Sequence, residues 1–223
     1  MTAHAHVRRE GRRGLTRCVF VIIVPCTLIE LGLLMSVLFV SDDVDLRRLT
    51  YSYGGFWPGL LDDWQPNYAA QPYLMFILYS FLHSGLVHLV LNMITLWSLG
   101  LAVADRVNCR GFILLYWASV LGGAIGYATL ANGLTPMVGA SGGLFGLAGG
   151  LLAWSYVDRF TAAQGLLPIL QITVILVFLN LFLWWAMAGQ IAWQTHLGGF
   201  VSGWIMAFLI DPRPVSSAEV EQE

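Results

Sequence analysis

The sequence contains no lysine, so each of its 11 basic residues is an arginine. Charge of either sign is scarce: 11% of the 223 residues are charged, 57% are hydrophobic, and the formal net charge is −2. So little charge does not suit the surface of a soluble globular protein. The sequence has no basic patch of the kind that would indicate nucleic-acid binding. The composition predicts an integral membrane protein whose surroundings are the lipid bilayer.

Other absences narrow the function. No H-E-x-x-H pattern occurs, which argues against a zinc protease, and we expect no metal or cofactor. No inverted repeat is present and few charges beyond Glu30 fall inside apolar runs, which disfavours a transporter or channel. The three cysteines, Cys18, Cys26 and Cys109, lie in or beside apolar runs, and we interpret them as packing residues that form no disulfide framework.

Long apolar runs are what the sequence does contain. A span of about 20 apolar residues crosses a bilayer of about 30 Å. Six runs qualify and predict an all-α bundle of six transmembrane helices at residues 18–40, 84–104, 111–130, 141–157, 166–188 and 191–210. The remaining segments are an arginine-rich start (1–17), one long connection (41–83) and a polar tail (211–223). The first run resembles a signal peptide but is too long for one, so we expect a retained anchor.

The arginines predict the orientation. Nine of the 11 fall before the first run, after the last, or in the connections on the same side, and only Arg47 and Arg48 fall in the long connection. Positive charge marks the cytoplasmic side, so both termini are expected inside and residues 41–83 outside, on the membrane interface. The short arginine-rich start, with no targeting extension, suits a bacterial inner (cell) membrane.

Four polar residues converge near the outer leaflet in this arrangement. Ser141 begins the fourth run, in VGASGGLFGLAGG, and His196 lies in the sixth. His88 and Asn92 stand four residues apart in the second run and therefore share one helical face. His83 points elsewhere, and we expect it to hydrogen-bond the long connection.

Small residues allow the fourth and sixth helices to approach closely. Gly142, Gly146 and Gly150 repeat at intervals of four, as do Gly199 and Gly203. Such ridges let membrane helices pack backbone to backbone. A hydroxyl at the start of one helix can then reach an imidazole on the other.

This combination predicts nucleophilic catalysis. Ser141 would attack an amide carbonyl and His196 would take its proton, then return it to the leaving amine. The N–H groups at the start of the fourth helix, with side-chain donors from Asn92 and His88, would stabilise the oxyanion. No buried carboxylate is available as a third member, so the arrangement is a dyad.

Each residue also has a plainer interpretation. A serine in a glycine-rich membrane helix, or a single membrane histidine, is more often a packing residue, and Asn92 suits an interhelical hydrogen bond. Because all four residues are expected at the same depth in the membrane, we favour the catalytic interpretation. The role of Glu30 stays open, with a structural hydrogen bond favoured.

Polar and aromatic residues of the last two runs are assigned structural roles. We interpret Gln171, Thr173 and Asn180 as structural polar contacts. Three tryptophans are interpreted as an interfacial belt, with a lateral gate as the functional alternative: Trp184, Trp185 and Trp193.

Taken together, the segment FLHSGLVHLVLNM, the GASGG around Ser141, and His196-x2-Gly199-x3-Gly203 resemble the rhomboid family of intramembrane serine proteases. The resemblance implies a Ser141–His196 dyad with an oxyanion site from His88, Asn92 and the N–H groups of Ala140 and Ser141. It also implies substrates that are single-span membrane proteins, admitted by movement of the fifth helix and the loop near 189–190.

Two positions depart from the family pattern. A Trp-Arg pair often precedes the first histidine, and the stretch here reads QPYLMFILYSF, which leaves the anchoring of the long connection open. Phe145 stands where some members carry a tyrosine that stacks on the catalytic imidazole. The alternative function is a non-catalytic rhomboid-like protein that binds transmembrane segments; such proteins usually lack the serine or the histidine, and this sequence has both.

Overall fold

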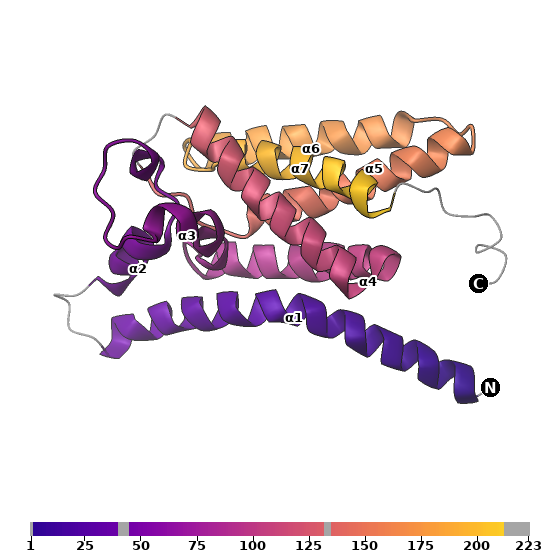
Figure 1. Cartoon of the computed structure of the whole chain (residues 1–223), viewed down its shortest axis with the longest axis horizontal. Helices are drawn as coiled ribbons and strands as arrows, with labels where there is room; N and C mark the ends of the chain where they lie inside the picture. Colours follow the sequence, from indigo (N-terminus) through magenta and orange to yellow (C-terminus); the bar gives the residue numbers. More distant parts are fainter. Residues whose placement is uncertain (1, 40–44, 132–134, 212–223) are drawn as a thin grey trace.

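The computed structural model describes residues 2–39, 45–131 and 135–211, and this part of the chain is built from helices (Figure 1). In order they are α1 (Thr2–Phe39), α2 (Leu46–Gly54), η1 (Pro58–Leu61), α3 (Gln71–Leu78), η2 (Tyr79–Phe81), α4 (Leu86–Leu130), α5 (Ser141–Thr161), α6 (Leu167–Ala186) and α7 (Trp193–Ile210). The predicted all-α membrane fold is confirmed. The long connection, predicted only to lie on the interface, contains α2, η1, α3 and η2.

Helix α4 is a hairpin of two legs. Its helical backbone breaks at Val107 (φ −120°, ψ 15°) and Asn108 (φ 61°, ψ −178°), and the Asn108 side chain accepts the N–H of Arg110 at 2.9 Å. Figure 1 shows the chain reversing there. The two legs correspond to the predicted spans 84–104 and 111–130, so α4 supplies two of the six predicted membrane helices.

Three of the described helices are long and apolar enough to cross a membrane by length and composition alone: Gly14–Ser36 within α1, Leu86–Leu130 and Leu167–Ala186. Helices α5 and α7 are rich in glycine and carry polar residues, which lowers their hydropathy. They are the two helices that carry Ser141 and His196.

Helix α1 packs along the first leg of α4, where Phe20 contacts Trp97 at a ring-centroid distance of 5.3 Å. The helix begins at Thr2, so the backbone of the arginine-rich start is helical and continuous with the first span. Cys18 and Cys109 form a disulfide across this contact, with their Cα atoms 5.8 Å apart. Our interpretation of all three cysteines as packing residues was therefore wrong for these two. Only the buried Cys26 remains a free thiol among the described residues.

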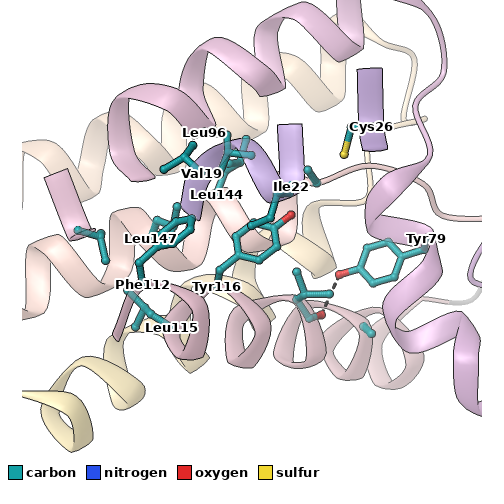
Figure 2. Close-up of a cluster of buried hydrophobic side chains, with 14 of the residues drawn as sticks. Val19, Ile22, Cys26, Tyr79, Leu96, Phe112, Leu115, Tyr116, Leu144 and Leu147 are labelled. Carbon is teal, nitrogen blue, oxygen red and sulfur yellow. Dashed lines mark hydrogen bonds between the residues drawn. The ribbon is translucent and has the colours of Figure 1, made fainter. Parts of the chain in front are cut away.

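The apolar core lies where α1, α4 and α5 meet beneath the long connection. Figure 2 shows Ile22 of α1, Tyr116 of α4 and Leu144 of α5 in this cluster. Tyr79, from η2, is fully buried and its hydroxyl donates to the carbonyl of Val120 at 2.8 Å. The long connection is thus fastened to the second leg of α4.

The opposite end of the bundle is closed by charged and aromatic side chains. Arg106 donates to the Asp158 carboxylate at 2.7 Å, and its guanidinium lies 5.1 Å from the ring centroid of Trp154. The Trp154 indole N–H in turn donates to the carbonyl of Ala207 at 3.0 Å. These contacts join the ends of α5 and α7 to the turn of α4, at the end where α1 begins (Figure 1).

Candidate active site

The structure brings together Ser141 and His196, which are 55 residues apart. Ser141 is the first residue of α5 and His196 the fourth of α7. The Nε2 atom of His196 lies 2.9 Å from the Ser141 Oγ, within hydrogen-bond distance. His196 is buried, with 6% of its surface exposed. In this geometry an imidazole is able to accept the proton of a serine hydroxyl.

Glycines set the separation between α5 and α7. A Cβ atom at Gly199 would collide with the carbonyl oxygen of Gly142, and one at Gly203 would collide with the carbonyl of Gly146. The backbones therefore touch, as small-residue ridges allow. His196 lies one turn before Gly199, so the close contact of the two helices places His196 against the start of α5. Gly150, lower on the ridge, faces the Leu115 side chain.

The segment before Ser141 is held by the long connection. Phe56 and Met137 exchange two backbone hydrogen bonds of 3.0 and 2.9 Å, and the Gly139 N–H donates to the Tyr79 carbonyl at 2.9 Å. Gly139 has φ +126°, a conformation that favours glycine. This turn lets the helix begin abruptly at Ser141, with the buried Ala140 as its N-cap residue.

Among the described residues, no side chain caps the start of α5. The first N–H groups of an α-helix have no acceptor within the helix and carry the positive end of its dipole. An oxyanion formed beside the Ser141 hydroxyl would therefore meet backbone donors from Ala140 and Ser141.

Phe145 fixes the plane of the imidazole. Its ring stacks on His196 with centroids 4.2 Å apart and an interplanar angle of 8°. Phe145 lies one turn after Ser141, so the same face of α5 presents the serine hydroxyl and the stacking ring.

Asn180 is a contact that sequence analysis missed. Its Oδ1 lies 2.7 Å from the Nδ1 of His196, on the side of the ring opposite Ser141. We had interpreted Asn180 as a structural polar contact, because nothing local in a long apolar helix tells which neighbour an amide faces. The signal was the amide itself, since buried polar groups in membrane helices need a partner.

His88 borders the same turn. The Ser84 N–H donates to His88 Nδ1 at 3.3 Å, which places the ring proton on Nε2. A Cβ built on Gly139 would lie 3.0 Å from that Nε2 and 3.9 Å from the Ser141 Oγ, so the ring flanks the turn that leads into Ser141. The Nε2–H of His88 is thus a donor near the Ser141 side chain.

Asn92 is buried one turn below His88, and its amide donates to the His88 carbonyl at 3.0 Å. It makes no hydrogen bond to Ser141 in the part of the chain that the structure describes. The bond it makes lies within its own helix, and the amide carries a second N–H.

Sequence comparisons identify the family of this chain. The family model for the rhomboid domain matches residues 70–213, well over half of the chain. The chain belongs to the rhomboid family. The match takes in both legs of α4, both glycine ridges and all the site residues named above except Phe56, whereas α1 and α2 lie outside it.

Named relatives of this rhomboid come from plants, bacteria and yeast. RHOMBOID-like protein 5 of Arabidopsis thaliana is 31% identical over 60% of this chain and 42% of its own length. Rhomboid protease GluP of Bacillus subtilis (strain 168) is 33% identical over 56% of this chain and 24% of its own. Rhomboid protein 1, mitochondrial, of Saccharomyces cerevisiae is 32% identical over 59% of this chain and 40% of its own length. The chain spans less than half the length of these relatives.

We expected the ring of His83 to hydrogen-bond the long connection of this rhomboid, but neither ring nitrogen has a hydrogen-bond partner among the described residues. The fully buried imidazole packs against His88 at a centroid distance of 5.1 Å, and burial, with a smaller effect from His88, lowers the pKa of His83 to about 4. The His83 carbonyl makes the link instead: it accepts from Arg47 at 2.8 Å and from the Tyr51 hydroxyl at 2.6 Å.

Arg47 is the hydrogen-bond partner of Glu30, and it anchors the long connection, which lacks a Trp-Arg pair before His83. Its guanidinium donates to both Glu30 carboxylate oxygens, at 2.7 and 3.1 Å, and this bonding raises the pKa of Arg47. The Arg47–Glu30 pair joins α2 to α1. The bond from Arg47 to the His83 carbonyl joins both of them to the segment that leads into α4. The role favoured for Glu30, a structural hydrogen bond, agrees with these contacts. The signal available in the sequence was an isolated acid in the first span with an arginine shortly after it.

Proposed function

We propose that this rhomboid is an intramembrane serine endopeptidase that cleaves transmembrane segments of single-span membrane proteins. The observation that carries the proposal is the 2.9 Å contact between His196 Nε2 and Ser141 Oγ. A serine whose only role was packing needs no buried imidazole at hydrogen-bond distance, with an aromatic ring stacked on its face.

In the proposed mechanism the Ser141 hydroxyl attacks the scissile carbonyl while His196 Nε2 takes its proton. The new C–O bond places the negative charge on the carbonyl oxygen. Donors for that oxyanion are the backbone N–H groups of Ala140 and Ser141, the His88 Nε2–H and the second amide N–H of Asn92. His196 then gives the proton to the amine as the C–N bond breaks, and water hydrolyses the acyl-enzyme.

The substrate must enter from the bilayer and unwind, because the carbonyls of an intact helix are hydrogen-bonded internally. Helix α6 is the element best suited to move aside for the substrate. Ile169 is its only buried residue, and the connection to α7 contains two residues with positive φ, Ala188 (50°) and Gly189 (80°). From the distribution of the arginines we also propose that both termini lie in the cytoplasm, with a bacterial inner membrane as the location.

The test is cleavage of a reporter transmembrane substrate in liposomes. Ser141→Ala and His196→Ala should each abolish cleavage, since either change removes the nucleophile or its base. Ser155→Ala, a serine change in the same helix away from the site, should cleave like the unaltered protein. A fluorophosphonate should label the unaltered chain and not Ser141→Ala.

Cleavage by Ser141→Ala at the rate of the unaltered chain would refute the proposal. Binding of transmembrane segments without cleavage or labelling would favour the alternative, a non-catalytic rhomboid-like binder.

A further inference from the structure

The imidazole of His196 is held by three different helices. Its Nε2 contacts Ser141 of α5 at 2.9 Å and its face stacks on Phe145 of the same helix. Its own backbone belongs to α7. The Nδ1 atom contacts the Oδ1 of Asn180, which belongs to α6, at 2.7 Å. The third contact therefore comes from a helix that neither glycine ridge holds.

The atom types in this contact fix the position of a proton. An amide oxygen can only accept a hydrogen bond, so the His196 Nδ1 that faces it carries the hydrogen. A neutral imidazole has one ring proton, which leaves a lone pair on Nε2. That lone pair points at the Ser141 hydroxyl and can accept its proton. With the other tautomer, Nε2 would carry a hydrogen and could not act as the base.

Helix α6 is the most weakly packed of the membrane helices. Ile169 is its only buried residue, and its outward side chains include Phe178, 67% exposed, and Leu181, 56% exposed. Asn180 is partly buried at the inner face. Figure 1 shows α6 alongside α7 at the side of the bundle away from α1. A small displacement of α6 would therefore break the hydrogen bond between Asn180 and His196 without disturbing the glycine contact between α5 and α7.

We propose that Asn180 is a positioning residue that holds His196 in the tautomer and orientation needed to activate Ser141, and that it couples this activation to the closed position of α6. The inference rests on the proposed protease function. When α6 moves away to admit a substrate, the acceptor on Nδ1 leaves with it. The base is restored when α6 returns, so cleavage follows closure of the bundle around the substrate.

A simple latch would behave in the opposite way. If the Asn180–His196 bond only kept α6 closed, its loss would ease substrate entry and speed the reaction. If Asn180 orients the base, its loss slows the chemical step. The sign of the effect therefore separates the two roles.

The experiment uses the full chain with two near-isosteric variants. Asn180→Leu removes the acceptor, and Asn180→Asp keeps an oxygen that accepts from Nδ1–H. The matched control is Thr173→Val on the same helix, whose lost hydroxyl bonds only to its own helix, at the Ile169 carbonyl. Cleavage in liposomes gives kcat and KM, and fluorophosphonate labelling gives the reactivity of Ser141 without a transmembrane substrate.

We expect Asn180→Leu to lower kcat and the labelling rate by about 10- to 100-fold, the kinetic equivalent of one buried hydrogen bond, with KM changed less than about threefold. Asn180→Asp should recover most of the rate, and Thr173→Val should match the unaltered chain. An unchanged or faster rate in Asn180→Leu, while Ser141→Ala is inactive, would overturn the positioning role and leave the protease function intact.

Nuclear magnetic resonance of ¹⁵N-histidine-labelled protein tests the proposal without catalysis. The His196 proton should reside on Nδ1 in the unaltered chain and shift toward Nε2 in Asn180→Leu. A proton on Nε2 in the unaltered chain would overturn the proposal. Failure of the protease function is recognised separately, by equal rates for the unaltered chain and Ser141→Ala.

Discussion

Replacing Gly199 by alanine tests the closeness of α5 and α7 with a single added methyl group. The new Cβ would collide with the Gly142 carbonyl, which belongs to the rigid backbone of the facing helix and cannot turn aside. The matched control is Gly32→Ala in α1, where a Cβ would have no atom within 4 Å. Both changes add one methyl to a membrane helix, and only one of them meets a neighbour.

The expected magnitude follows from the geometry. To give the methyl an ordinary van der Waals contact, the helices must separate by about 1.5 Å. The distance from His196 Nε2 to Ser141 Oγ is 2.9 Å, and an added ångström breaks that hydrogen bond. A misplacement of about 1 Å lowers an enzymatic rate by about 100-fold, equivalent to about 2.7 kcal/mol. Overpacking should also cost about 1–3 kcal/mol of stability.

The assay is the initial rate of reporter cleavage in liposomes, measured beside thermal unfolding in detergent so that loss of activity can be separated from loss of fold. Gly203→Ala makes the same collision at Gly146, one turn farther from the site, and should lower the rate less than Gly199→Ala does. Gly32→Ala should leave rate and stability unchanged. A folded Gly199→Ala protein that cleaves within twofold of the unaltered chain would refute the reasoning.

Two further predictions concern parts of the fold outside the site. Arg47→Ala leaves the fully buried Glu30 carboxylate without its cation and should lower stability by about 3 kcal/mol, at the low end for a buried pair because the Arg47 side chain is 30% exposed. Thermal unfolding checks this against the exposed neighbour variant Arg48→Ala, and equal unfolding temperatures for the two would contradict it. Mass spectrometry of unreduced digests should find one peptide that links Cys18 to Cys109, and alkylation of both thiols without prior reduction would show that the disulfide is absent.

The features that sequence analysis identified depend on local pattern. The apolar runs indicate membrane helices because the bilayer has a fixed thickness. The four-residue spacing of Gly199 and Gly203 indicates one small face because it matches the helical repeat. Ser141 could be placed at a helix start because it opens a glycine-rich apolar run. Each inference needs only neighbours in the chain.

Features that escaped sequence analysis depend on partners from distant segments. The Cys18–Cys109 pairing needs the register of α1 against the turn of α4. Asn180 was recognised as polar, but its partner depends on how α6 is rotated toward α7, and an almost uniformly apolar helix gives no periodicity from which to infer that rotation.

The sequence by itself determined that this chain is a helical membrane protein and which residues could perform acyl transfer, because hydrophobic length, helical spacing and side-chain chemistry are properties of short segments. Only the tertiary structure decided which groups touch: that the His196 ring lies between Ser141 and Asn180, and that the carbonyl of His83 bonds the long connection in place of its ring. Contacts between helices depend on their rotation and separation, and these are set jointly by the whole bundle.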